Sequence, residues 1–162
     1  MGAALLFVAG TRLTDRLIRR VEQIDHLPDA PTPLATHVAL LFDGAWGVQA
    51  VWPRVARYDR DDYAGAVTRS YPLPLSPQQE TGLQQAALAT LGEWYDLLGV
   101  VKAGLYVLTG RPERFWEDDR ARVQCAAEAV VTLRAVGLSV LPALPPSNVT
   151  PARLECWAPR VA

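Results

Sequence analysis

Cysteine and histidine are scarce in this chain, with two of each among 162 residues. Two cysteines do not form the disulfide framework of a small secreted domain, so Cys125 and Cys156 are expected to be reduced, with one disulfide between them as the alternative. The acidic group at residues 117–119 has no histidine or cysteine at ligand spacing, which argues against a metal site. A glycine-rich phosphate loop and a G-x-S-x-G elbow are absent, so we expect no nucleotide chemistry, no serine hydrolysis and no cofactor.

A charge excess and long apolar runs are missing as well. The formal net charge is −1, and without a cluster of Lys or Arg the chain is not expected to bind nucleic acid. No run approaches the roughly 18 consecutive apolar residues of a membrane span, so we expect no transmembrane segment. Residues 3–9 are apolar but have no positive residue before them and four arginines soon after them. This pattern favours a buried strand over a signal peptide and predicts cytoplasmic synthesis.

The chain does contain enough apolar sequence for one packed domain. Half of its residues are hydrophobic, and without a linker or an internal repeat they predict a single domain over residues 1–162. Residues 3–9 are predicted to form a fully buried strand. Residues 38–42 and 48–52 flank the turn signal Asp43-Gly44 and are predicted to form a hairpin. A further extended segment is predicted at residues 67–75.

Helices are predicted from the spacing of apolar residues and from capping residues. Ser76, Pro77 and Gln79 form a complete helix start, with a capping serine, a proline at the first helical position and a glutamine at the capping-box position. The predicted helices cover residues 13–24, 77–91, 96–108 and 124–136, the last one ending at Gly137, and a final helical turn follows Thr150. With the strands, they predict an α+β fold in which helices pack on a small antiparallel sheet.

Cys125 and His37 are the candidate catalytic pair. In the first turn of the predicted helix, unpaired backbone N–H groups and the positive end of the helix dipole favour a thiolate at Cys125. His37 opens an apolar strand at the rim of the predicted sheet, where its ring can face a cleft and act as a base. The structural alternatives are a buried cysteine that only packs and a strand-end histidine that bonds a loop carbonyl. His26, in a proline-bordered loop, is the weaker rival for the base.

Gln49 is the candidate that would orient the imidazole, because a base works better when another side chain fixes its tautomer. An odd loop length around Asp43-Gly44 places Gln49 opposite His37 on the same face of the hairpin, whereas an even length places Ala50 there. A glutamine orients through its amide oxygen and adds no negative charge. The alternative interpretation is a surface glutamine.

Tyr95 and the small residues after Cys125 complete the predicted site. Tyr95 is placed between two predicted helices and is a candidate hydrogen-bond donor into the cleft near Cys125, or else a core aromatic with its hydroxyl at the surface. Ala126 and Ala127 would let a substrate carbonyl approach the N–H groups at the helix start, which makes an oxyanion site.

The order of these segments resembles that of permuted NlpC-type cysteine peptidases over nearly the whole chain. The segments that carry the resemblance are Ala4-Leu5-Leu6-Phe7-Val8, Arg12-Leu13-Thr14-Asp15-Arg16-Leu17-Ile18-Arg19-Arg20, Thr36-His37-Val38-Ala39-Leu40, Val48-Gln49-Ala50, Gly92-Glu93-Trp94-Tyr95-Asp96-Leu97-Leu98-Gly99, the helix from Cys125 to Gly137-Leu138, and Thr150-Pro151-Ala152-Arg153-Leu154. In that family the papain-like fold is circularly permuted, so that the histidine precedes the cysteine, as it does here.

The resemblance implies a role for each candidate residue. Cys125 matches the nucleophile, His37 the base, Gln49 the polar orienting position and Tyr95 a tyrosine beside the site. The family usually has a small polar residue after the cysteine, where this chain has Ala126. It often has glutamate at the orienting position, where this chain has Gln49.

A thiol-dependent hydrolase that cleaves an amide or acyl bond is therefore the expected function. The resemblance implies cell-wall peptides (peptidoglycan fragments) as substrates, with lipid or other acyl-amide substrates as a second option, and activity on the cell wall would require export or release by lysis. One alternative is a non-catalytic module that keeps the cleft to bind a peptide or lipid. Another is an accessory component of a phage or secretion assembly.

Overall fold

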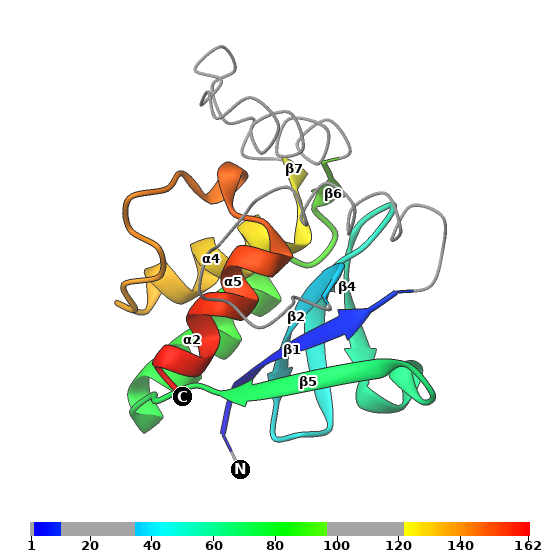
Figure 1. Ribbon diagram of the computed structural model, residues 1–162, viewed down its shortest axis with the longest axis horizontal. Helices are drawn as coiled ribbons and strands as arrows, with labels where there is room; N and C mark the ends of the chain where they lie inside the picture. Colours follow the sequence, from blue (N-terminus) through cyan, green and yellow to red (C-terminus); the bar gives the residue numbers. More distant parts are fainter. Residues whose placement is uncertain (1, 11–34, 97–121) are drawn as a thin grey trace.

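The computed structural model describes residues 2–10, 35–96 and 122–162 (Figure 1). The helix predicted at residues 13–24 lies outside the described residues, as do His26 and the acidic group at residues 117–119. The helix predicted at residues 96–108 lies outside them except for Asp96, which is not helical.

Five antiparallel strands form the main sheet. They are β1 (Ala4–Ala9), β2 (His37–Phe42), β3 (Trp46–Ala50), β4 (Val55–Asp59) and β5 (Val67–Pro72), in the spatial order β4-β3-β2-β1-β5. The strand predicted at residues 3–9 is confirmed, and the extended segment predicted at residues 67–75 is a strand only as far as Pro72.

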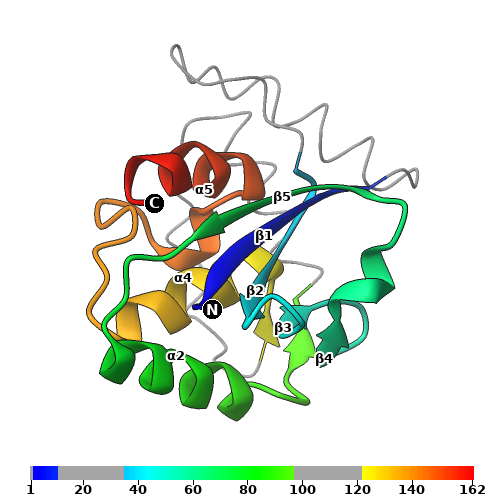
Figure 2. The ribbon, with the colours of Figure 1, turned by 90° about the horizontal axis from the view of Figure 1, so that it is seen from below.

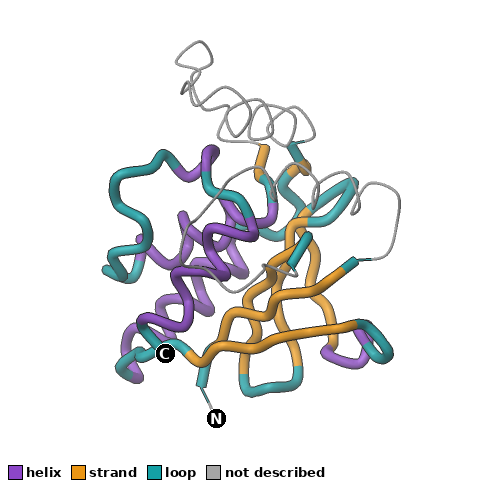
Figure 3. Tube along the Cα trace, in the orientation of Figure 1, coloured by secondary structure: helices purple, strands orange, loops and turns teal. Residues whose placement is uncertain are grey.

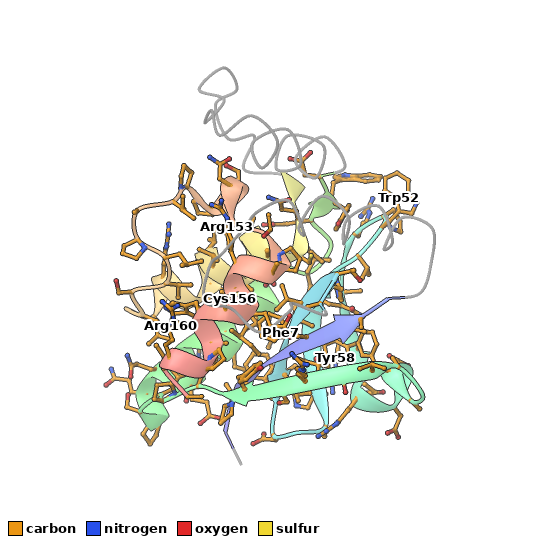
Figure 4. All side chains as sticks on the ribbon, viewed as in Figure 1. Phe7, Trp52, Tyr58, Arg153, Cys156 and Arg160 are labelled. Atoms are coloured by element: carbon orange, nitrogen blue, oxygen red, sulfur yellow. The ribbon has the colours of Figure 1, made fainter. Side chains whose placement is uncertain are left out.

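The sheet separates two groups of buried side chains. Successive residues of a strand point to opposite faces, so the apolar run of β1 fills both. We call the larger group the helix-side core; it includes Leu5, Phe7, Val38, Leu40 and Val48. The smaller group, the outer cluster, contains Ala4, Leu6, Val8, Ala39, Leu41 and Tyr58, with Tyr63 packed against it. Figure 4 labels Phe7 of the helix-side core and Tyr58 of the outer cluster.

The predicted hairpin is present, but its second strand begins earlier than expected. A three-residue turn joins Phe42 to Trp46, and two of its residues, Asp43 and Gly44, have φ values of 52° and 71°. Such values suit a glycine and are tolerated by aspartate. This turn fixes β3 at Trp46–Ala50, not at residues 48–52 as predicted. Trp52 therefore lies outside the strand, in the loop before β4, and is 65% exposed (Figure 4).

Strand β4 was not predicted from the sequence. It is an edge strand in which buried and exposed residues do not alternate regularly, because the buried Val55 and Tyr58 are separated by two more exposed residues. Its pairing with β3 leaves room only for glycine at Gly47, where a Cβ would overlap the Leu40 carbonyl oxygen and the Tyr58 ring. A short 3-10 helix, η1 (Arg60–Tyr63), follows β4.

Three α-helices are described: α2 (Pro77–Ala89), α4 (Cys125–Ala135) and α5 (Pro151–Trp157). They lie together on one side of the main sheet (Figures 1–3). The predicted capping residues are confirmed at α2, where the Ser76 Oγ accepts from the Gln79 N–H at 3.3 Å. Helix α4 begins and ends within a residue of its predicted limits, and Gly137 beyond it has a φ of 86°.

The architecture confirms the predicted α+β class, with helices packed on a small antiparallel sheet. A second, two-stranded parallel sheet pairs β6 (Trp94–Tyr95) with β7 (Arg122–Val123), directly before α4. None of the described helices combines the length and the apolar content needed to cross a membrane. Cys125 and Cys156 are not joined by a disulfide.

Candidate functional site

His37 and Gln49 are in direct contact. The turn between β2 and β3 has an odd number of residues, so both side chains lie on the same face of the sheet. Leu40 pairs with Val48, and continuing this register places Gln49 across from Ala39. His37 is thus the diagonal neighbour of Gln49 and not its directly opposite partner, which corrects the predicted alignment. The His37 Nε2 lies 2.9 Å from the Gln49 Oε1.

This contact decides where the imidazole carries its proton. The Gln49 Oε1 can only accept a hydrogen bond, so the His37 Nε2 is the donor. A neutral imidazole has one N–H, and its other nitrogen then holds the lone pair. In this arrangement Nδ1 is the basic nitrogen of His37.

Tyr63 is the third member of the group, and the sequence did not predict it. Its hydroxyl donates to the same Gln49 Oε1. Its ring centroid lies 6.3 Å from that of His37 and 5.4 Å from that of Tyr58, the latter pair edge to face. A carbonyl oxygen has two lone pairs, so Gln49 can accept from both donors. His37, Gln49 and Tyr63 therefore form one hydrogen-bonded group on the face of the outer cluster.

The position of Tyr63 is fixed by η1 and its backbone contacts. The Asp59 N–H donates to the Asp62 carboxylate at 3.0 Å, which closes the start of η1. The Arg60 N–H donates to the Ala45 carbonyl at 2.8 Å and ties η1 to the β2–β3 turn. No sequence motif signals this placement, because it depends on the pairing of β3 with β4.

Cys125 is the first residue of α4 and therefore lies in the first turn of the helix, as predicted. It is 7% exposed and belongs to the helix-side core. Burial raises the pKa of Tyr63 to about 12, with the charge of Cys125 and then that of Asp62 adding to the rise, while the hydrogen bond to Gln49 opposes it. The thiol of Cys125 and the phenol of Tyr63 are therefore within electrostatic range of each other.

The thiol and the imidazole are placed by different contacts with the sheet. Helix α4 packs against β2 and β3 on the helix-side face, where Val38 and Leu40 lie. His37 is the first residue of β2 and pairs with Val8 of the outer cluster, and its ring lies near that of Tyr63.

The start of α4 offers backbone donors beside the thiol. The first N–H groups of a helix have no carbonyl four residues before them within the helix. The Glu128 N–H is the first in this helix to donate to a carbonyl four residues earlier, that of Gln124, at 2.8 Å. Gln124 itself is held by its side-chain amide, which donates to the Ser147 carbonyl at 2.7 Å. Ala126 and Ala127 follow Cys125 in this turn, and both are buried.

Tyr95 lies beside the segment that leads into α4. It pairs with Val123, two residues before Cys125. Its N–H donates to the Pro53 carbonyl at 3.0 Å, and its half-buried ring packs against the helix-side core. The structure thus brings the Tyr95 backbone close to the nucleophile candidate and gives its ring a packing role.

A buried carboxyl in α4 was also missed. Glu128 is 1% exposed, and its Oε1 lies 3.2 Å from the Thr132 hydroxyl. Burial raises its pKa to about 8; the charge of Glu93 adds to the rise, and the hydroxyls of Thr132 and Thr90 oppose it. Within the described part of the chain, no three His, Cys, Asp or Glu side chains gather as a metal site would require.

No protein-family model and no curated protein sequence matches this chain.

Proposed function

We propose that this protein is a thiol-dependent hydrolase in which Cys125 is the nucleophile, His37 the base and Gln49 the orienting residue. The observation that carries the proposal is the hydrogen-bonded group formed by His37, Gln49 and Tyr63, in a chain whose Cys125 begins helix α4. A thiol in the first turn of a helix and an imidazole with a fixed tautomer are the parts that nucleophilic catalysis by cysteine needs.

The proposed reaction has two steps. The His37 Nδ1 takes the proton of the Cys125 thiol, and the sulfur attacks the carbonyl carbon of an amide or related acyl bond. The N–H groups at the start of α4 stabilise the oxyanion, and the imidazolium returns its proton to the leaving group as the bond to the acyl carbon breaks. Water, deprotonated by His37, then attacks the thioester and releases the acid, which regenerates the thiol.

The resemblance to permuted NlpC-type peptidases supports the same assignment. In that family the histidine precedes the cysteine in the sequence. Here His37 opens β2, Gln49 lies on β3 and Cys125 begins α4. We therefore propose the permuted papain-like fold, with cell-wall peptides or other acyl amides as the substrate class.

A second candidate function is a non-catalytic module that binds a peptide or lipid. The burial of Cys125 favours it, because a nucleophile has to meet its substrate. The packing of Cys125 in the helix-side core points the same way.

Alkylation by iodoacetamide below neutral pH separates the two candidates. Cys156 is more exposed than Cys125, so access alone predicts that Cys156 reacts faster. A thiolate activated by His37 reverses this order, because the thiolate is the reactive form. We expect Cys125 to react faster in the Cys156→Ser variant than Cys156 does in the Cys125→Ser variant.

The His37→Ala variant completes the test. It should slow the alkylation of Cys125 by about tenfold or more, as expected for loss of a general base. His26→Ala, which removes the only other histidine, is the matched control and should leave the rate unchanged. Slow alkylation of Cys125 that does not depend on His37 would reject the hydrolase and favour the binding module.

A further inference from the structure

The amide of Gln49 has two ends of nearly equal shape and opposite hydrogen-bonding character. With its oxygen toward His37, the amide accepts from the Nε2 N–H, as observed at 2.9 Å. With its nitrogen toward His37, it would donate to Nε2 and move the imidazole proton to Nδ1. Only the observed orientation leaves a lone pair on Nδ1. Something near Gln49 must therefore favour one orientation over the other.

The Tyr63 hydroxyl meets this requirement. It donates to the same amide oxygen that His37 uses. If the amide reversed, the hydroxyl would face an N–H donor and its own proton would lose this acceptor. Tyr63 is half-buried, and a donor that is partly shielded from water loses free energy when its acceptor is removed, so the reversed orientation is disfavoured. The His37 and Tyr63 rings lie beside each other, with their centroids 6.3 Å apart.

We propose that Tyr63 is a positioning residue, whose hydroxyl orients the Gln49 amide and so keeps the His37 proton on Nε2. The inference rests on the proposed function only in giving Nδ1 the role of base. The tautomer itself is a property of the unliganded protein. It can be measured whether or not the protein is an enzyme.

Tyr58 provides a matched control within the same cluster. Its ring packs against that of Tyr63, and its hydroxyl donates to the Leu40 carbonyl at 3.2 Å. Tyr58→Phe and Tyr63→Phe therefore each remove one hydroxyl and one hydrogen bond from the outer cluster. Only Tyr63→Phe removes a bond to Gln49.

The first experiment is nitrogen NMR of the histidine rings in the full-length, isotopically labelled protein. A His26→Gln variant assigns the signals, because the chain has only two histidines. We expect His37 to be protonated on Nε2 in the wild type and in Tyr58→Phe, and to become a mixture of tautomers in Tyr63→Phe. An unchanged His37 tautomer in folded Tyr63→Phe overturns the proposal. Protonation on Nδ1 in the wild type overturns it without any variant.

The second experiment uses the symmetry of a carboxylate. In a Gln49→Glu background both oxygens accept, so no orientation needs to be chosen. Tyr63→Phe should then leave the His37 tautomer unchanged, although it shifts the tautomer when Gln49 is present. An equal shift in both backgrounds would mean that Tyr63 acts through packing and would overturn the orienting role.

Alkylation of Cys125 connects the tautomer to chemistry. If the hydrolase proposal holds, Tyr63→Phe should slow alkylation about fivefold, the equivalent of one ordinary hydrogen bond, and Tyr58→Phe should not. If His37→Ala leaves alkylation unchanged while Tyr63→Phe still shifts the tautomer, the proposed function fails and the orienting role of Tyr63 stands. The two proposals therefore fail on different measurements.

Discussion

Replacing Glu128 by glutamine tests whether α4 contains a neutral buried carboxyl. The side chain is 1% exposed, and its Oε2 has no hydrogen-bond partner among the described residues. The Thr90 hydroxyl is nearby, but it donates to the Ala87 carbonyl at 2.8 Å. Burial explains why the pKa of Glu128 is raised from 4.5 to about 8.

The direction of the pH effect follows from this raised pKa. The folded protein binds the Glu128 proton more tightly than the unfolded chain does. The contribution to stability is therefore complete below about pH 4.5 and is lost as the pH rises toward 8. The slope is about 1.4 kcal/mol per pH unit, so the whole interval corresponds to a loss of about 5 kcal/mol as an upper bound.

Urea unfolding followed by tryptophan fluorescence provides the assay, since the chain has five tryptophans. The difference in free energy of unfolding between the wild type and Glu128→Gln should change by about 4 kcal/mol between pH 5 and pH 8, in favour of the variant at high pH. Any fixed cost of burying the amide cancels in this comparison. Glu80→Gln on α2 controls for the loss of one negative charge. Parallel pH profiles for the wild type and Glu128→Gln would refute the reasoning.

Two further substitutions test the polar contacts of individual side chains. The Arg134 guanidinium donates to three backbone carbonyls between residues 140 and 144. Arg134→Lys should lower the free energy of unfolding, measured by urea titration, by about 2 kcal/mol, because the lysine ammonium cannot donate to all three carbonyls at once. Glu155 accepts from the Ala35 N–H at 3.1 Å and pairs with Arg69 at 3.2 Å. Glu155→Gln should cost about 1 kcal/mol, and no loss in low salt would contradict a stabilising ion pair.

Local signals in the sequence predicted most of the described elements. The capping residues around Ser76 act within one turn of helix. The apolar run of β1 indicates a buried strand without knowledge of the strands that pair with it. The limits of α4 likewise follow from its apolar composition and from Gly137. Each of these signals is complete within a short stretch of chain, which is why it could be interpreted without the fold.

The elements that the sequence did not predict depend on pairing. Strand β4 has little alternation of its own and is held at the sheet edge by its hydrogen bonds to β3. The exact start of β3 is set by the three-residue turn, and composition alone did not distinguish Trp46–Ala50 from residues 48–52. The contact of Tyr63 with Gln49 depends on both strands, because the two side chains meet only when β3 and β4 pair in this register. Because the register of β3 and β4 was not predicted, the contact of Tyr63 with Gln49 was not predicted either.

The same reasoning explains why His37 and Cys125 are the hardest pair to place from sequence. The register of the β2–β3 hairpin determines which face His37 occupies, whereas the packing of α4 on β2 and β3 determines where Cys125 lies. These interactions are independent of each other. Tyr63 contacts His37 and Gln49 directly, and the charge of Cys125 adds to the rise of the Tyr63 pKa. A substitution at Tyr63 therefore tests whether the base and the nucleophile act together.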